Sequence, residues 1–254
     1  MVSGMRLFRK IRKKLLISGK LRNYIVYAIG EILLIVIGVL IAWKINNLNE
    51  LRKNRIVELK IYQSLSEELN SNLVLLDASI VNYTESVKAI EGTIAIVMDE
   101  LPSQYTEAQK SNIIFVNYQP TQLHNGAINS VNTTNKFEFI ESVLLKDLIA
   151  AYPNELDNFQ NQESNIENIV INRLQPAIEN YISLIDMLKK REFKFNCFKT
   201  FSTESNYTQL LKSREYQNSL VDRLLQTEIQ LTNAKSLRNK TEIIAFQLNK
   251  ELKN

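Results

Sequence analysis

One stretch of twenty residues, 24–43, constrains this chain more than any other part of its sequence. It reads YIVYAIGEILLIVIGVLIAW and contains a single charged residue, Glu31. As a helix it extends over about 30 Å, the thickness of the hydrocarbon core of a bilayer. Tyr27 and Trp43 lie near its two ends, where aromatic rings favour the membrane interface. We therefore predict a transmembrane helix over residues 23–45.

Two other structures compete for such a segment. The core helix of a globular protein rarely needs twenty nearly continuous apolar residues behind a dense basic block. A cleavable signal peptide has a shorter basic region, a shorter apolar core and a small-x-small cleavage pattern, which is not found before Trp43. We therefore expect a signal-anchor that stays in the mature protein.

The basic residues before this segment predict its orientation. Residues 1–23 contain eight of the 31 lysines and arginines and no acidic residue, whereas the charges after Trp43 are mixed. The positive-inside rule then predicts a cytoplasmic tail over residues 1–22 and a periplasmic domain over residues 46–254. The abundance of Asn, Ile and Lys suggests a bacterial protein, so the expected location is the bacterial inner membrane.

The tail itself has two possible structures. It is either a short amphipathic helix on the anionic inner leaflet or a disordered positive-inside signal. In both cases six basic side chains are expected to contact the membrane surface: Arg6, Arg9, Lys10, Arg12, Lys13 and Lys14.

The rest of the composition excludes several classes of function. Beyond the tail, 23 basic residues face 27 acidic ones, the wrong sign for a surface that binds nucleic acid. Cys197 and His124 are the only residues of their types, so an intrachain disulfide and a cysteine-based metal site are excluded. No phosphate loop, dinucleotide fingerprint or calcium loop is present. We expect no catalytic residue, no metal and no cofactor.

Two features inside the apolar segment suggest association with another helix. An ionised carboxylate is costly in the membrane and usually faces a partner, a cavity or the interface. Glu31 therefore either makes such a contact, or it is protonated or snorkels to the cytoplasmic headgroups. Gly30, Gly38 and Ala42 fall on one helix face at multiples of four residues, where small side chains allow close helix packing. The predicted association site is thus Gly30, Glu31, Gly38 and Ala42.

Beyond the membrane, the sequence predicts an all-α protein, an elongated helical bundle or coiled-coil-like domain. No proline occurs between Trp43 and Pro102. Apolar residues there follow a heptad frame interrupted at Ser66. Its a positions are Leu59, Leu73, Ile80, Val87, Ile94 and Leu101, and its d positions are Tyr62, Leu69, Leu76, Tyr83, Ile90 and Val97.

Further helices are expected along the chain, at about 113–116, 123–131 and 141–152. Pro153 is expected to open another helix that Pro176 kinks. We interpret the aromatic segment 193–201 as a connector. A last long helix from Ser213 is expected to pack antiparallel to the heptad helix.

The apolar segment also resembles the start of an uncharacterised bacterial family of single-span membrane proteins, a domain of unknown function. Its members carry a YAIGEILLVVIGILIA-like span followed by an NNWNE-like motif. The matching residues are Tyr27, Ala28, Ile29, Gly30, Glu31, Ile32, Leu33, Gly38, Ile41, Ala42, Asn46, Asn47, Asn49 and Glu50. Leu48 replaces the usual Trp, and the stretch 128–152 is similar as well. The resemblance implies that Gly30 and Glu31 form a meaningful pair, and it brings no catalytic residue.

Together these features favour a non-enzymatic, membrane-anchored scaffold or adaptor that acts through helix–helix association in the cell envelope. Its expected partners are the lipid bilayer and either a second copy of the chain or another envelope membrane protein. The alternative is an extracytoplasmic sensor-like domain that works with a separate signalling partner, because a tail of 22 residues contains no output domain. An unfamiliar enzyme is the third possibility, and a buried cluster of perturbed carboxylates would indicate it.

Overall fold

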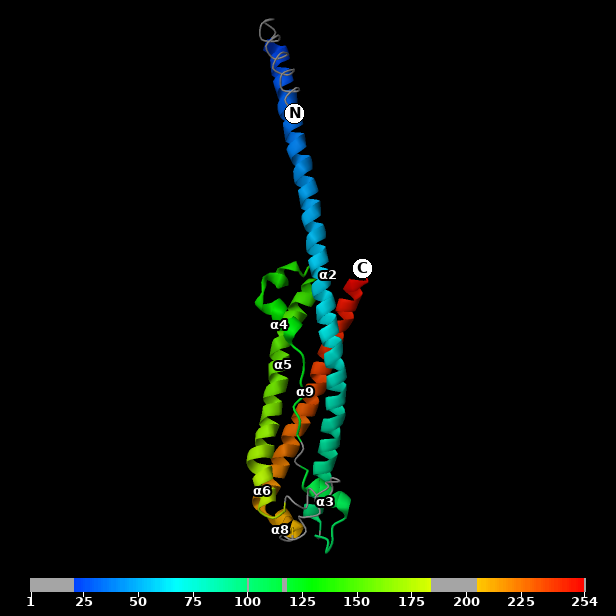
Figure 1. Ribbon diagram of the computed structural model, residues 1–254, viewed down its shortest axis with the longest axis vertical. Helices are drawn as coiled ribbons and strands as arrows, with labels where there is room; N and C mark the ends of the chain where they lie inside the picture. The colour runs from blue at the N-terminus through cyan, green and yellow to red at the C-terminus, as the bar shows by residue number, and fades with distance from the viewer. Residues whose placement is uncertain (1–20, 100, 116–117, 184–204, 254) are drawn as a thin grey trace, which may run out of the picture. The chain divides into compact units, whose positions relative to one another are not determined.

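The computed structural model describes residues 21–99, 101–115, 118–183 and 205–253, and every regular element among them is a helix (Figure 1). The all-α prediction is confirmed. The chain divides into two units, Met1–Val57 and Glu58–Asn254. The main elements are α2 (Leu21–Met98), α3 (Glu107–Ile113), α4 (Gly126–Thr133), α5 (Val143–Ile169), α6 (Gln175–Glu179), α8 (Tyr207–Lys212) and α9 (Arg214–Leu252).

Helix α2 is unbroken over 78 residues and contains both the apolar segment and the heptad region that follows it. It ends at Met98, shortly before Pro102, as expected for a segment free of proline. Among the described residues it is the one helix that is long and apolar enough to cross a membrane, and none of its most apolar stretch is buried. The structure thus contains one candidate membrane-spanning helix near the N-terminus.

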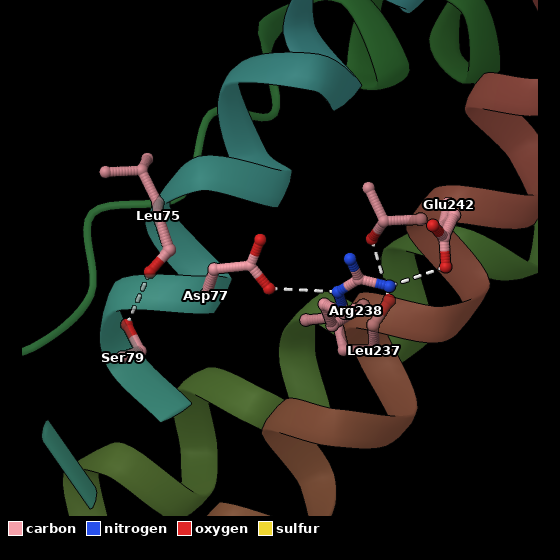
Figure 2. Close-up of polar contacts among 7 residues, drawn as sticks. Leu75, Asp77, Ser79, Leu237, Arg238 and Glu242 are labelled. Atoms are coloured by element: carbon pink, nitrogen blue, oxygen red, sulfur yellow. Dashed lines mark hydrogen bonds and ion pairs between the residues drawn. The ribbon is translucent and has the colours of Figure 1, made fainter. Parts of the chain in front are cut away.

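In the unit Glu58–Asn254, helix α9 lies antiparallel to α2, as predicted. Ser66 Oγ donates a hydrogen bond of 3.2 Å to Asn249 Oδ1, and Arg238 Nε donates one of 2.9 Å to Asp77 Oδ1. Arg238 also contacts Glu242 one turn further along α9 (Figure 2). Since residue numbers rise along α2 as they fall along α9, the two helices run in opposite directions.

Helix α5 completes the bundle and is also antiparallel to α9. Tyr152 pairs with Thr241 at 2.8 Å between the hydroxyl oxygens, and Gln162 Nε2 donates to the backbone oxygen of Gln226 at 2.9 Å. Two apolar clusters fill the interior, one around Leu69 at the α4 end and one around Leu174 at the α3 end.

The heptad frame of α2 is right for one column and wrong for the other. The d residues Tyr62, Leu69, Leu76, Tyr83 and Ile90 are buried, but the a residues expected beside them are only half-buried. The second buried column is the g column: Glu58, Leu65, Asn72, Ser79 and Thr93. Two of the polar g side chains, Asn72 and Ser79, bind the extended segment 118–125, whereas Glu58 accepts from the backbone N–H of Glu141.

The sequence predicted that Pro153 opens a new helix, and this prediction is wrong. Pro153 lies inside α5. A proline has no N–H to donate to the carbonyl four residues earlier, here that of Ile149. Asn132 supplies the missing donor, since its Nδ2 donates to Ile149 O at 3.2 Å. A side chain distant in sequence therefore lets the helix continue through the proline.

The remaining boundaries differ from the prediction in detail. The irregularity expected at Pro176 is a π-helical turn, Val170–Leu174, immediately before it, a common cause of helix kinks. Helix α3 ends at Ile113, where the sequence suggested that a helix begins, and α4 begins three residues later than expected. Helix α9 begins after Ser213, as predicted, and the Ser213 side chain caps it. The connector 193–201 lies outside the described residues.

Candidate functional site

Residues 118–125 run in irregular, extended form along the bundle between α3 and α4 (Figure 1). Side chains of α2 and α5 form hydrogen bonds with the backbone groups of this segment. Asn72 Nδ2 donates to His124 O at 2.7 Å, and His124 N donates to Asn72 Oδ1 at 2.8 Å. Thr121 N donates to Glu163 Oε1 at 2.8 Å. Because buried backbone groups must be paired, these polar side chains fix the position of the segment.

Glu68 of α2 binds backbone groups in the same way at the start of α4. The Glu68 carboxylate accepts hydrogen bonds from Ala127 N (2.7 Å) and Ile128 N (3.0 Å) at the start of α4. It replaces a local cap, because the side chain of Asn125 makes no capping hydrogen bond. A negative charge at a helix N-terminus also complements the helix dipole.

A buried cluster at mid-bundle joins α2, α5 and the extended segment. Tyr83 OH donates to Glu163 Oε1 at 2.5 Å, and the hydroxyl oxygens of Ser79 and Thr121 lie 2.7 Å apart. Burial raises the pKa of the Glu163 carboxyl above its ordinary value, although the hydrogen bonds from Tyr83 and Thr121 act in the opposite direction.

Next to this cluster lies a pocket of about 620 Å³, which we call the Arg223 pocket. Its walls come from α2, α3, α5 and α9 and from Phe115, Tyr118 and Gln119. They carry amide and hydroxyl groups from Asn82, Asn112 and Thr227 as well as the Phe115 ring. The pocket is thus of the size typical for small-molecule sites and is more polar than most of them.

Arg223 brings a buried positive charge to this pocket. The residue is 2% exposed, its Nη1 donates to Phe115 O, and its Cζ lies 5.1 Å from the centre of the Phe115 ring. Burial lowers the pKa of Arg223 to about 10, so the guanidinium remains protonated at neutral pH. Its charge and orientation are therefore fixed in the wall.

Tyr118 contributes a buried hydroxyl group. This hydroxyl has no hydrogen-bond partner among the described residues. Burial is the main cause that raises the pKa of the Tyr118 phenol, and the charge of Glu163 adds to it. A buried phenol without a partner is unfavourable, so it is a natural contact for a bound molecule or water.

The predicted association site lies on the part of α2 in the unit Met1–Val57. A Cβ atom added to Gly30 or to Gly38 would meet no atom within 4 Å, so both positions are open. Ala42 is exposed and Glu31 is half-buried. The six basic residues expected at the membrane surface lie outside the described residues.

Sequence reasoning missed the Arg223 pocket and the Tyr83–Glu163 contact. The available signal was a charged residue at a position where helical periodicity expects an apolar one: Glu163 lies between Phe159 and Ile166 of α5, and Arg223 lies between Leu220 and Leu224 of α9. His124 is exposed in the structure, as expected for a loop histidine, and only its backbone is bound by Asn72. Within the described ranges no group of three His, Cys, Asp or Glu residues could hold a metal ion.

No protein-family model, curated protein or solved structure matches this chain. The resemblance noted from the sequence therefore stays a prediction.

Proposed function

We propose that this protein is a membrane-anchored scaffold or adaptor of the bacterial inner membrane that acts by helix–helix association. In this proposal the apolar part of α2 anchors the chain with its N-terminus in the cytoplasm, and the helical bundle projects into the periplasm. The observation that carries the proposal is the exposure of that apolar part. Ile32, Leu34 and Val39 are each more than half exposed, so a surface this apolar requires lipid or another helix to cover it.

A second observation supports association through the bundle itself. Five apolar side chains of α9 are 45–66% exposed: Val221, Leu225, Ile229, Ile243 and Phe246. At 100° per residue they fall within an arc of roughly 100° on one side of the helix. Polar residues at Thr232 and Ser236 divide the row into two patches. Exposed apolar patches of this kind are typical of surfaces that contact other proteins.

Site-specific photocrosslinking in native membranes tests this proposal. A photoreactive amino acid at Leu225 or Phe246 is expected to form adducts with a second copy of the chain or with another envelope protein. The matched control is the same amino acid at Asp157, an exposed polar position of α5. Recovery of the monomer alone from both apolar positions would contradict association through α9.

The predicted site in the membrane is tested separately. Replacing both Gly30 and Gly38 with Leu fills the open helix face, and Glu31→Gln removes the charge while it keeps the shape. A partner that is co-purified with the natural protein and lost from both variants would tie the apolar segment to assembly. If both variants retain the partner, the segment acts as an anchor alone.

The Arg223 pocket favours a second candidate function, a sensor-like domain that binds a small molecule outside the cytoplasm and works with a separate signalling protein. A polar pocket of about 620 Å³ with a buried charge is more than a scaffold requires. A ligand that raises the melting temperature of the protein and changes its crosslinking pattern would support this function.

A further inference from the structure

We propose that the Arg223 pocket binds a small organic monocarboxylate, with the carboxylate group on the Arg223 guanidinium. This inference goes beyond the proposed scaffold function and depends on neither the membrane anchor nor a partner protein. It rests on the charge, the geometry and the size of one pocket inside the unit Glu58–Asn254.

The first step is the placement of the charge. A guanidinium that is 2% exposed and still lines a pocket is largely shielded from bulk water, so it attracts an anion more strongly than a surface arginine does. The Phe115 carbonyl and ring hold it in one orientation. The five N–H donors of an arginine can serve both this carbonyl and a carboxylate.

The second step is the number of charges. Among the described residues that line the pocket, Arg223 is the one cation, and the acidic residue Glu85 lines the same pocket from the exposed side of α2. A dianion such as phosphate would be repelled by Glu85 and would have a single cation to balance it. The charges in the wall therefore fit a single negative charge and disfavour a double one.

The third step is the uncharged part of the ligand. The Tyr118 hydroxyl is buried without a partner among the described residues and can donate to a ligand oxygen. Asn82 and Asn112 offer further donors and acceptors, and the Phe115 ring offers a flat apolar contact. About 620 Å³ leaves room for an organic group next to the carboxylate. These features together indicate a small, partly polar organic acid.

Calorimetry on the full-length protein in lipid nanodiscs, with empty nanodiscs as the blank, tests the proposal. The probes are benzoate and 4-hydroxybenzoate, each compared with its neutral amide, and inorganic phosphate. We expect at least one carboxylate to bind with a dissociation constant on the order of 1 mM or tighter. Its amide and phosphate should bind at least about tenfold more weakly. Binding of no carboxylate, or equal binding of the amide, would overturn the proposal.

Two variants assign the binding to this pocket without disturbing the contacts of Arg223. Tyr118→Phe should raise the melting temperature of the free protein, because it removes an unpaired buried hydroxyl, and should weaken carboxylate binding about fivefold. Glu85→Gln should strengthen binding several-fold, since it removes a nearby negative charge. A purely structural role of these residues would change stability and leave affinity unaltered. Unchanged affinity in both variants would place the ligand elsewhere and refute the assignment.

Discussion

The hydroxyl of Tyr83 on α2 donates a 2.5 Å hydrogen bond to the Glu163 carboxylate on α5, in the middle of the buried helical bundle. Both residues are largely removed from water, with exposed fractions of 6% and 3%. Thr121 N donates to the same carboxylate oxygen, so this contact joins two helices and the extended segment between them. A buried charge of this kind makes stability depend on the donors around it.

Removing one donor should destabilise the fold. Tyr83→Phe keeps the ring and its packing but leaves the Glu163 carboxylate without one of its hydrogen bonds. We expect a loss of about 1–3 kcal/mol in the free energy of unfolding, measured by chemical denaturation followed by circular dichroism. Tyr181→Phe, at a half-buried position near the end of the bundle, is the matched control. Equal effects of the two changes would show that the Tyr83 hydroxyl has no special role.

The Glu163 carboxyl should also make stability depend on pH. Burial raises its pKa in the folded protein above the ordinary value of 4.5, so the folded state binds this proton more tightly than the unfolded chain does. Its contribution to stability is therefore fully present below pH 4.5 and is lost as the pH rises through the folded pKa. Between pH 7 and pH 5, the melting temperature of the natural protein should rise relative to that of Glu163→Gln. If the melting temperatures of the two proteins changed equally between pH 7 and pH 5, the raised pKa of Glu163 would be contradicted.

Asn72 should hold the extended segment in place. Asn72→Ala removes both hydrogen bonds to the backbone of His124 in a fully buried position. We expect a loss of about 2–3 kcal/mol and faster hydrogen exchange in residues 118–125. Asn154→Ala, at an exposed position of α5, should leave both quantities unchanged. If exchange in this segment stayed slow in Asn72→Ala, other contacts would be sufficient to fix it.

Arg223 and Arg238 of α9 should differ sharply in their effect on stability. Arg223→Ala empties a buried site and takes a donor away from the Phe115 carbonyl, so a loss of about 3 kcal/mol or more is expected. Arg238 bridges Asp77 and Glu242 at the surface, where water screens ion pairs (Figure 2). Arg238→Ala should therefore keep the natural unfolding midpoint. A large shift for Arg238→Ala would mean that the surface bridge matters more than its exposure suggests.

The apolar part of α2 should determine membrane association. The double variant Leu34→Arg and Ile37→Arg places two charges at the middle of the predicted span, at a cost of about 2.5–3.5 kcal/mol each. It should move the protein into the fraction that alkaline carbonate extracts. Val74→Arg combined with Val81→Arg, at exposed positions in the bundle, should leave the protein in the membrane fraction. Extraction of the natural protein itself would refute the anchor.

The sequence alone determined the features that depend on local chemistry. The nearly continuous apolar stretch 24–43 and the absence of proline up to Pro102 predict a long helix with an apolar first part, and α2 has these properties. The start of α9 at Ser213 follows from the same local rules. Such features need only propensity, periodicity and capping, each of which can be recognised within a few turns of one helix.

Only the tertiary structure decided which polar residues are buried. The g column of α2 has the composition of a solvated face, but Asn72 and Ser79 within it are buried because residues 118–125 pack against them and pair with them. Pro153 lies inside α5 because Asn132, from another element, donates to the carbonyl of Ile149. Arg223 forms part of a pocket because the chain around Phe115 folds over α9. Each of these outcomes depends on a contact between residues distant in sequence, and no local pattern encodes such a contact.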